Sequence, residues 1–201
     1  MSMFTLQTCR VEKCANWAVH GREVCRKHLE DPKSYDREIA AALSESDKIT
    51  DMNLCSAVLK DLDLGGKSIE RCILSDSDLR GVDFAGCRIS LVYLDFCVLN
   101  NCSFRAARFH NVVFAGSSIE DCNFSGSDII RCNFCGVRCS ETLFDESDLY
   151  ASRFVASNLS RIGFKDCNLK QVRFENAEIL EADFRYSNTE DAFFQTKAHK
   201  L

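Results

Sequence analysis

The chain has 201 residues, of which 46% are hydrophobic, and it carries a formal net charge of −5 at pH 7. This length and apolar content allow one sizeable folded domain and exclude general disorder, and the mild negative charge argues against a generic nucleic-acid-binding surface. Apolar stretches are too short to span a membrane and the amino terminus lacks a secretory pattern, so we expect a cytoplasmic protein without membrane association. The 13 cysteines are odd in number and recur mainly at one position of a repeat, so we interpret most of them as reduced core thiols.

Residues 1–30 contain four potential metal ligands, Cys9, Cys14, Cys25 and His28. Thiol and imidazole ligands at this spacing are typical of tetrahedral structural zinc sites, and the motif resembles small Cys3His zinc knuckles. A segment this short cannot build a hydrophobic core, so metal binding would supply most of its folding free energy. Because four protein ligands leave no open coordination position, the expected Zn2+ is structural. The alternative is a flexible arm that contains cysteines.

The same segment has a local positive charge. Between residues 9 and 28, two glutamates stand against five basic side chains, a net charge of +3: Glu12 and Glu23 against Arg10, Lys13, Arg22, Arg26 and Lys27. This charge leaves open the hypothesis of a nucleic-acid adaptor. A solvated surface is the simpler interpretation.

Residues 31–48 are expected to form a capping helix. Asp31 suits the N-cap and Pro32 the first helical position. Apolar side chains then fall on one helical face, namely Tyr35, Ile39, Ala42 and Leu43. A helix over about residues 32–46 should therefore cover the open end of the structure that follows.

Residues 49–195 repeat with a period of five. Counting in fives from Leu54 to Phe194 gives 29 positions, of which only Cys139 and Thr189 are not Leu, Ile or Phe. Two residues earlier in each pentad the side chain is nearly always small, and Lys67 is the clear exception. A period of five fits neither a helix nor a plain strand, so the chain must turn once per pentad with two inward side chains.

Pentads such as Ser-Asp-Leu-Arg-Gly (77–81), Cys-Asn-Phe-Ser-Gly (122–126) and Ser-Asp-Leu-Tyr-Ala (147–151) resemble the pentapeptide-repeat family. The resemblance covers about three quarters of the chain. It implies an all-β fold, a right-handed quadrilateral parallel β-helix of about seven coils with four pentads in each. At a spacing of 20 residues, phenylalanines form two opposite ladders, one from Phe84 to Phe184 and one from Phe114 to Phe194.

The repeat register explains other conspicuous residues. A buried unpaired charge at Lys67 would be costly, so the first coil should be distorted to let it escape. Cys132 and Cys139 point inward on different faces and Cys135 points outward, which favours packing over a second metal site. Cys102 and Cys122 should stack in adjacent coils as thiols.

No catalytic constellation is present, since His20 and His110 have no nucleophile to serve, and we expect a protein that is not an enzyme. The first hypothesis is a protein-binding or scaffolding rod, because outward residues Ile73, Tyr93 and Val113 stack in consecutive coils with Phe96 nearby. Scattered surface hydrophobicity is the alternative.

The resemblance also suggests DNA mimicry, because some pentapeptide-repeat proteins present an acidic rod to DNA gyrase and protect it from quinolones. The candidate residues are Glu141, Asp145, Glu146 and Asp148, in a region of local charge −5. Residues 54–138 carry ten acidic and nine basic side chains, so the rod as a whole is not strongly DNA-like.

The carboxyl end raises the question of self-association. Beyond the repeat, residues 196–201 form a tail too short to cap much, and Phe193 is outward by register. Some pentapeptide-repeat proteins dimerise through this end, so a homodimer is one expectation and a capped monomer the other.

Overall fold

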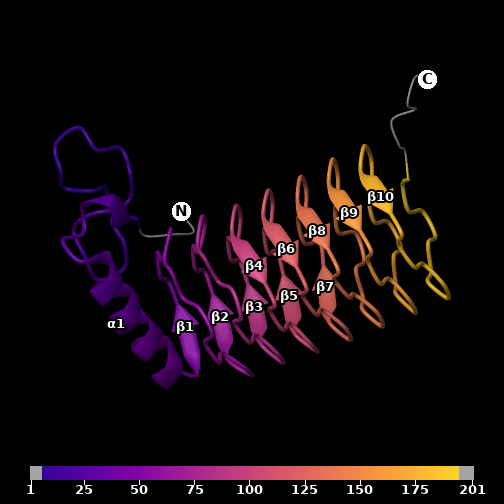
Figure 1. Ribbon diagram of the computed structural model, residues 1–201, viewed down its shortest axis with the longest axis horizontal. Helices are drawn as coiled ribbons and strands as arrows, with labels where there is room; N and C mark the ends of the chain where they lie inside the picture. The colour runs from indigo at the N-terminus through magenta and orange to yellow at the C-terminus, as the bar shows by residue number, and fades with distance from the viewer. Residues whose placement is uncertain (1–5, 195–201) are drawn as a thin grey trace.

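The computed structural model describes residues 6–194, and these form a parallel β-solenoid with one α-helix at its amino-terminal end (Figure 1). A single 3-10 turn (Arg26–His28) precedes helix α1 (Pro32–Glu45). Ten three-residue strands follow: β1 (Lys48–Thr50), β2 (Ser68–Glu70), β3 (Arg88–Ser90), β4 (Val98–Asn100), β5 (Arg108–His110), β6 (Ser118–Glu120), β7 (Asp128–Ile130), β8 (Arg138–Ser140), β9 (Asn158–Ser160) and β10 (Glu178–Leu180). The expected tail, residues 196–201, lies outside the described residues.

The coils stack with a constant register of 20 residues. One parallel sheet has the order β1-β2-β3-β5-β7 and the other the order β10-β9-β8-β6-β4. Every strand pair joins residues 20 apart, as in Ile49 with Ile69 and Ile119 with Cys139. Four pentads therefore make one coil, and the repeat accommodates about seven coils. The expected all-β solenoid is confirmed.

Each corner of the coil places one residue in the left-handed region. From Asp51 to Asp191 every fifth residue has a positive φ, and most of these residues are not glycine. A left-handed conformation costs a non-glycine residue on the order of 1 kcal/mol. Hydrogen bonds between coils offset this cost, because the corner N–H groups donate to the next coil, as Phe96 does to Ala115 O at 3.0 Å.

The core is built from two stacked ladders of phenylalanine. Within a ladder the rings lie nearly parallel, as in Phe104 and Phe124, whose centroids are 4.4 Å apart. Between ladders the rings meet edge to face, as in Phe134 and Phe144 at 5.9 Å and 89°. Both arrangements are favourable for aromatic quadrupoles. The ladders predicted from the sequence are confirmed.

The small inward residues contribute hydrogen bonds as well as space. Ser152 donates its hydroxyl to Ile129 O at 2.6 Å and accepts from Cys132 N at 2.9 Å. Buried cysteines at the same repeat position donate their thiols to equivalent carbonyls, as Cys97 does to Leu74 O at 3.0 Å. These side chains satisfy buried backbone groups that would otherwise be costly.

Helix α1 covers the first coil. The side chain of Asp31 accepts from Ser34 N at 2.9 Å, which is the expected N-cap interaction, and Tyr35, Ile39 and Leu43 are buried. The prediction for Ala42 was wrong, because it is exposed. Asp36, which was not expected in the core, is buried and forms an ion pair with Arg26.

Lys67 leaves the core by reaching the end of this helix. Its Nζ donates to Ser44 O and Ser46 O, both at 2.9 Å. A lysine at a helix C-terminus satisfies carbonyls that lack partners and interacts favourably with the helix dipole.

The opposite end of the solenoid is less covered. Large apolar side chains of the last described coil are exposed: Leu180 by 65%, Tyr186 by 81%, Phe193 by 56% and Phe194 by 41%. Within residues 6–194, no helix has the length and apolarity needed to cross a bilayer.

Candidate functional site

The four predicted metal ligands converge in the amino-terminal segment. The ligand atoms of Cys9, Cys14, Cys25 and His28 all lie within 4.8 Å of one another. Cys14 Sγ is 3.8 Å from Cys25 Sγ, and His28 Nδ1 is 3.3 Å from Cys9 Sγ and 3.5 Å from Cys25 Sγ. A tetrahedral zinc ion with ordinary bond lengths needs sulfur–sulfur edges of about 3.8 Å and sulfur–nitrogen edges of about 3.6 Å. The three distances fit this geometry.

Local backbone structure places these ligands. An antiparallel bridge between Thr8 and Trp17 brings Cys9 beside the loop that carries Cys14, and Cys9 N donates to Asn16 O at 2.9 Å. Cys25 leads directly into the 3-10 turn, where His28 N donates to Cys25 O at 2.9 Å. This turn puts the thiol and the imidazole on the same side of the loop.

The electrostatics of the cluster suit a cation. Burial opposes ionisation of Cys9, but hydrogen bonds from the Cys25 backbone and the His28 ring outweigh it and lower the Cys9 pKa to about 6. A hydrogen bond from the Asn16 backbone lowers the pKa of Cys14, yet burial and the neighbouring thiols raise it overall. Without a cation, the adjacent thiols compete for one negative charge, whereas a bound metal ion would stabilise all the thiolates together.

The metal-ligand segment, residues 6–28, is docked onto the helix and the first coil. His20 N donates to Asn53 O at 2.7 Å, and Asn53 Nδ2 donates to Ala18 O at 2.7 Å. Arg26 forms a two-pronged ion pair with the buried Asp36, and Asp36 Oδ1 also accepts from Val58 N at 3.2 Å. We call this docked segment the knuckle.

Three of the five basic side chains of the knuckle are already ion-paired. Arg10 pairs with Glu23, Arg22 with Glu38, and Arg26 with Asp36. Of the basic residues predicted to contact nucleic acid, this leaves Lys13 and Lys27 outside the ion pairs of the described chain. The structure therefore gives the nucleic-acid adaptor little support, because such affinity depends on basic groups that are available to phosphates.

The outward apolar residues lie in register on one side of the rod. Parallel bridges join Ile73 to Tyr93 and Tyr93 to Val113 in successive coils. Phe96 is 62% exposed, and its ring lies over the next coil, where a Cβ on Gly116 would approach it to 2.6 Å. We call Ile73, Tyr93, Val113 and Phe96 the apolar ladder.

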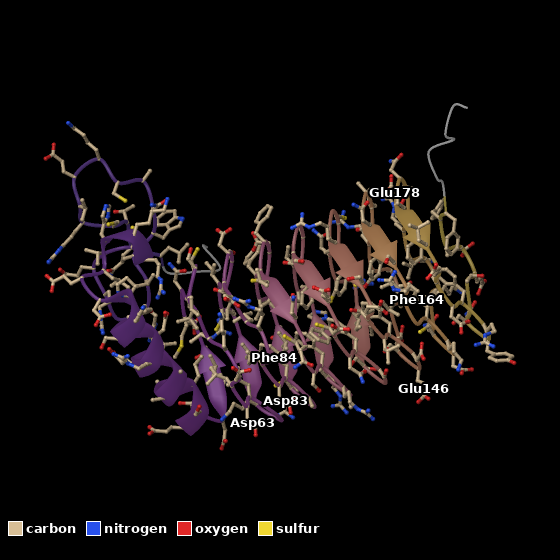
Figure 2. The ribbon with its side chains drawn as sticks, viewed as in Figure 1. Asp63, Asp83, Phe84, Glu146, Phe164 and Glu178 are labelled. Carbon is tan, nitrogen blue, oxygen red and sulfur yellow. The ribbon has the colours of Figure 1, made fainter. Side chains whose placement is uncertain are left out.

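The four acidic candidates do not form one cluster. Glu146 lies at the outer edge of the rod (Figure 2), at a corner of one coil next to Asp145. Glu141 occupies the preceding corner, and Asp148 lies on the face that follows Glu146. Glu141 forms an ion pair with Arg161, and Asp145 accepts from Lys165 N at 2.9 Å. Partial pairing of this kind weakens the negative potential expected from the sequence.

The remaining cysteines are placed as predicted. Cys132 and Cys139 are buried while Cys135 is half-buried, and these three do not converge as metal ligands within the described chain. Cys102 and Cys122 are free thiols that donate to Leu79 O and Leu99 O at 3.1 and 3.0 Å.

Sequence reasoning missed a groove between the knuckle and the first coils. Its walls include Trp17 and Lys27 on one side, and Ile73, Tyr93 and Asp95 on the other. Trp17, the sole tryptophan of the chain, is 49% exposed. A large aromatic residue in a segment too small to bury it was the available signal.

Comparison with known proteins points to the repeat. Residues 127–198 match the family model described as "Pentapeptide repeat region", and residues 87–126 match the model described as "Pentapeptide repeats (8 copies)". No curated protein matches the chain significantly.

Two solved structures are similar in fold. One trypsin-treated form of QnrB1, a plasmid-mediated fluoroquinolone resistance protein, is 16% identical, with a TM-score of 0.56 over 73% of this chain and 86% of that one. A second trypsin-treated form is 18% identical, with a TM-score of 0.53 over 77% of this chain and 85% of that one. Similarity at this level of identity establishes the solenoid fold and no more.

Proposed function

Because the chain belongs to the pentapeptide-repeat family, we propose that it acts as a non-enzymatic, protein-binding rod whose amino-terminal cap is held by a structural zinc ion. The apolar ladder is the observation that carries this proposal. A solenoid has a rigid backbone and presents side chains at fixed spacing, so a contiguous apolar group on its surface is a preformed docking surface.

The apolar ladder is contiguous rather than scattered. Along the same side of the rod, polar positions flank it: Asn53 precedes Ile73, and Asn133, Arg153 and Arg173 follow Val113 before the exposed Phe193 at the carboxyl-terminal end. Within the apolar ladder, Phe96 is exposed and the other three side chains are half-buried. The exposed apolar side chains Val98 and Leu143, on the middle of the rod, lie on different sides. Confinement to successive coils of one side supports a partner site.

The test is affinity capture from extracts of the source organism. The full-length protein is compared with the double variant Tyr93→Ser, Phe96→Ser, and with the control Val98→Ser, Leu143→Ser, which removes exposed apolar side chains elsewhere. We expect a partner retained by the wild type and the control and lost with the first variant. Equal retention by all three proteins would contradict a role for the apolar ladder.

The proposal of zinc rests on the donor set and its geometry. Three thiol sulfurs and one imidazole nitrogen lie within 4.8 Å of one another, and four protein ligands together would leave no position for substrate. A bound zinc ion would cross-link the knuckle, which has little hydrophobic core of its own. Through His20, Asn53 and the Arg26–Asp36 pair, the knuckle would then be held against the first coil.

Modulation of DNA gyrase is the second candidate. The fold shared with QnrB1 and the acidic side chains of Asp145, Glu146 and Asp148 favour it. Ion pairs at Glu141, Glu175, Asp183 and Glu190 weigh against a DNA-like surface. A gyrase supercoiling assay with and without a quinolone tests it, with inhibition or drug rescue as the supporting result and no effect on gyrases from several sources as the contrary one.

A further inference from the structure

The groove between the knuckle and the rod has a volume of about 490 Å3, which is in the range of ligand-binding sites. Three consecutive coils contribute one wall, through residues around Asn53, Ile73 and Tyr93. The knuckle contributes the other wall, including Trp17. The groove therefore joins the two parts of the chain and continues into the apolar ladder, with which it shares Ile73 and Tyr93.

Aromatic and aliphatic groups face this groove from both walls. Trp17 is 49% exposed although it belongs to a docked and hydrogen-bonded segment. A tryptophan held on a fixed backbone and left open to solvent is the kind of residue that dominates binding energy in protein interfaces.

The two walls of the groove carry charged side chains, and only some of these are ion-paired. Asp76 and Asp95 border the rod wall, and within residues 6–194 neither forms an ion pair. Asp95 accepts only a neutral hydrogen bond from the Ser75 hydroxyl, at 2.6 Å. On the knuckle wall, Arg26 is neutralised by Asp36, which leaves Lys27 as the exposed cation. Two carboxylates beside an apolar wall are complementary to a basic side chain that adjoins an apolar one.

Recognition in the groove must come from side chains. The backbone groups of its rod wall are already paired between coils, as Ile73 N is with Met52 O at 2.9 Å and Leu74 N is with Tyr93 O at 2.8 Å. No sheet edge is open there for strand addition, so specificity depends on pockets and charges.

Resting on the protein-binding function proposed above, we infer that this groove binds an extended segment of a partner protein in which an apolar side chain lies next to lysine or arginine. The apolar side chain packs between Trp17 and Tyr93, and the basic group pairs with Asp76 and Asp95. Cys25 itself borders the groove, so a metal ion bound by the Cys3His cluster would hold the knuckle wall in place.

The experiment is a selection of random dodecapeptides displayed on phage against the full-length, zinc-loaded protein. A synthetic copy of the most enriched peptide is then titrated while the fluorescence of Trp17 is recorded. We expect enriched peptides to combine apolar residues with lysine or arginine, and to change Trp17 fluorescence on binding. Binding should weaken by about tenfold or more in Asp76→Asn, Asp95→Asn, a change that keeps the acceptor for Ser75 and so spares the fold.

Asp166→Asn is the matched control, because this exposed carboxylate also lies at a corner and forms no ion pair within the described chain. Enrichment of acidic or wholly polar peptides, failure to enrich any peptide, or binding unaffected by the Asp76 and Asp95 changes would overturn the inference. So would Tyr93-dependent self-association, which would identify a second copy as the occupant. If Tyr93→Ser, Phe96→Ser abolishes partner capture while the aspartate variant does not, the protein-binding rod stands and the groove is excluded.

Discussion

Lys67 donates its ammonium group to the carbonyl oxygen of Ser46 at 2.9 Å, and thereby ties the first full coil to the end of the capping helix. The same group also reaches Ser44 O at 2.9 Å. A residue that breaks the repeat pattern thus helps to join the cap to the rod. Its chemistry fits, because the last carbonyls of a helix lack intrahelical donors.

The Lys67→Met variant should lose this connection. Methionine keeps the apolar stem but leaves two carbonyls without their donor, so we expect the free energy of unfolding to fall by about 1–2 kcal/mol. Urea denaturation followed by circular dichroism measures the change. Lys33→Met on the exposed face of α1 is the control and should leave stability within experimental error. Equal loss in the two variants would show that the contact contributes nothing.

Zinc content is the direct measure of the Cys3His cluster. Purified protein should contain one zinc ion per chain, and Cys25→Ser should lose most of it, because a serine hydroxyl is a poor ligand for zinc. Elemental analysis gives the stoichiometry. Cys135→Ser, a half-buried cysteine outside the cluster, should keep the full amount. Wild-type protein without zinc after expression in zinc-supplemented medium would contradict the proposal.

The inward hydroxyls should matter for stability. Ser152→Ala leaves the buried Cys132 N–H without its acceptor and removes the donor to Ile129 O, so we expect a loss of about 1–3 kcal/mol. Ser152→Cys should be milder, since cysteines elsewhere in the repeat donate to equivalent carbonyls, as Cys97 does. Ser160→Ala on β9 is the control. Thermal and urea unfolding compare the three, and an alanine variant as stable as the wild type would refute this role.

Asp78 should contribute stability that depends on pH. The hydrogen bond from Arg80, with help from Lys60, outweighs burial and lowers the pKa of Asp78 to about 2. Because the folded pKa is depressed, the stabilisation is present above the unfolded value near 4 and is lost as pH falls towards 2. We therefore expect Asp78→Asn to cost about 1–2 kcal/mol at pH 7, with the difference vanishing near pH 2. The free energy of unfolding is measured from pH 2 to pH 7 for the wild type, for Asp78→Asn and for the control Asp166→Asn. A difference between wild type and Asp78→Asn that does not change with pH would contradict this prediction.

The exposed carboxyl-terminal coil should mediate self-association. Leu180, Tyr186 and Phe193 present a large apolar area at an end that no described element covers, and such an end tends to pair with a second copy. We expect a concentration-dependent dimer in sedimentation equilibrium that Tyr186→Ser, Phe193→Ser abolishes. Leu143→Ser, Val98→Ser changes exposed apolar residues on the middle of the rod and should preserve the dimer. A monomer at all concentrations would rule out this mode of assembly.

The sequence by itself determined the solenoid, its register and its aromatic ladders. Those features repeat every five residues, so one local rule applied along the chain fixes which side chains face inward. The cluster of Cys9, Cys14, Cys25 and His28 could also be recognised, because residue type and spacing lie within one short segment. The N-cap at Asp31 could be predicted because a capping signal also lies within a few consecutive residues.

Only the tertiary structure decided which surfaces meet. Three features depend on how the cap sits on the first coils: the partner of Lys67, the burial of Asp36, and the groove between Trp17 and Tyr93. The pairing of Glu141 with Arg161 likewise follows from the stacking of one coil on the next. These contacts join residues that are distant in sequence, and they depend on the shape and charge of the surfaces that meet. A periodic pattern carries no information about the place where the repeat stops and the cap begins.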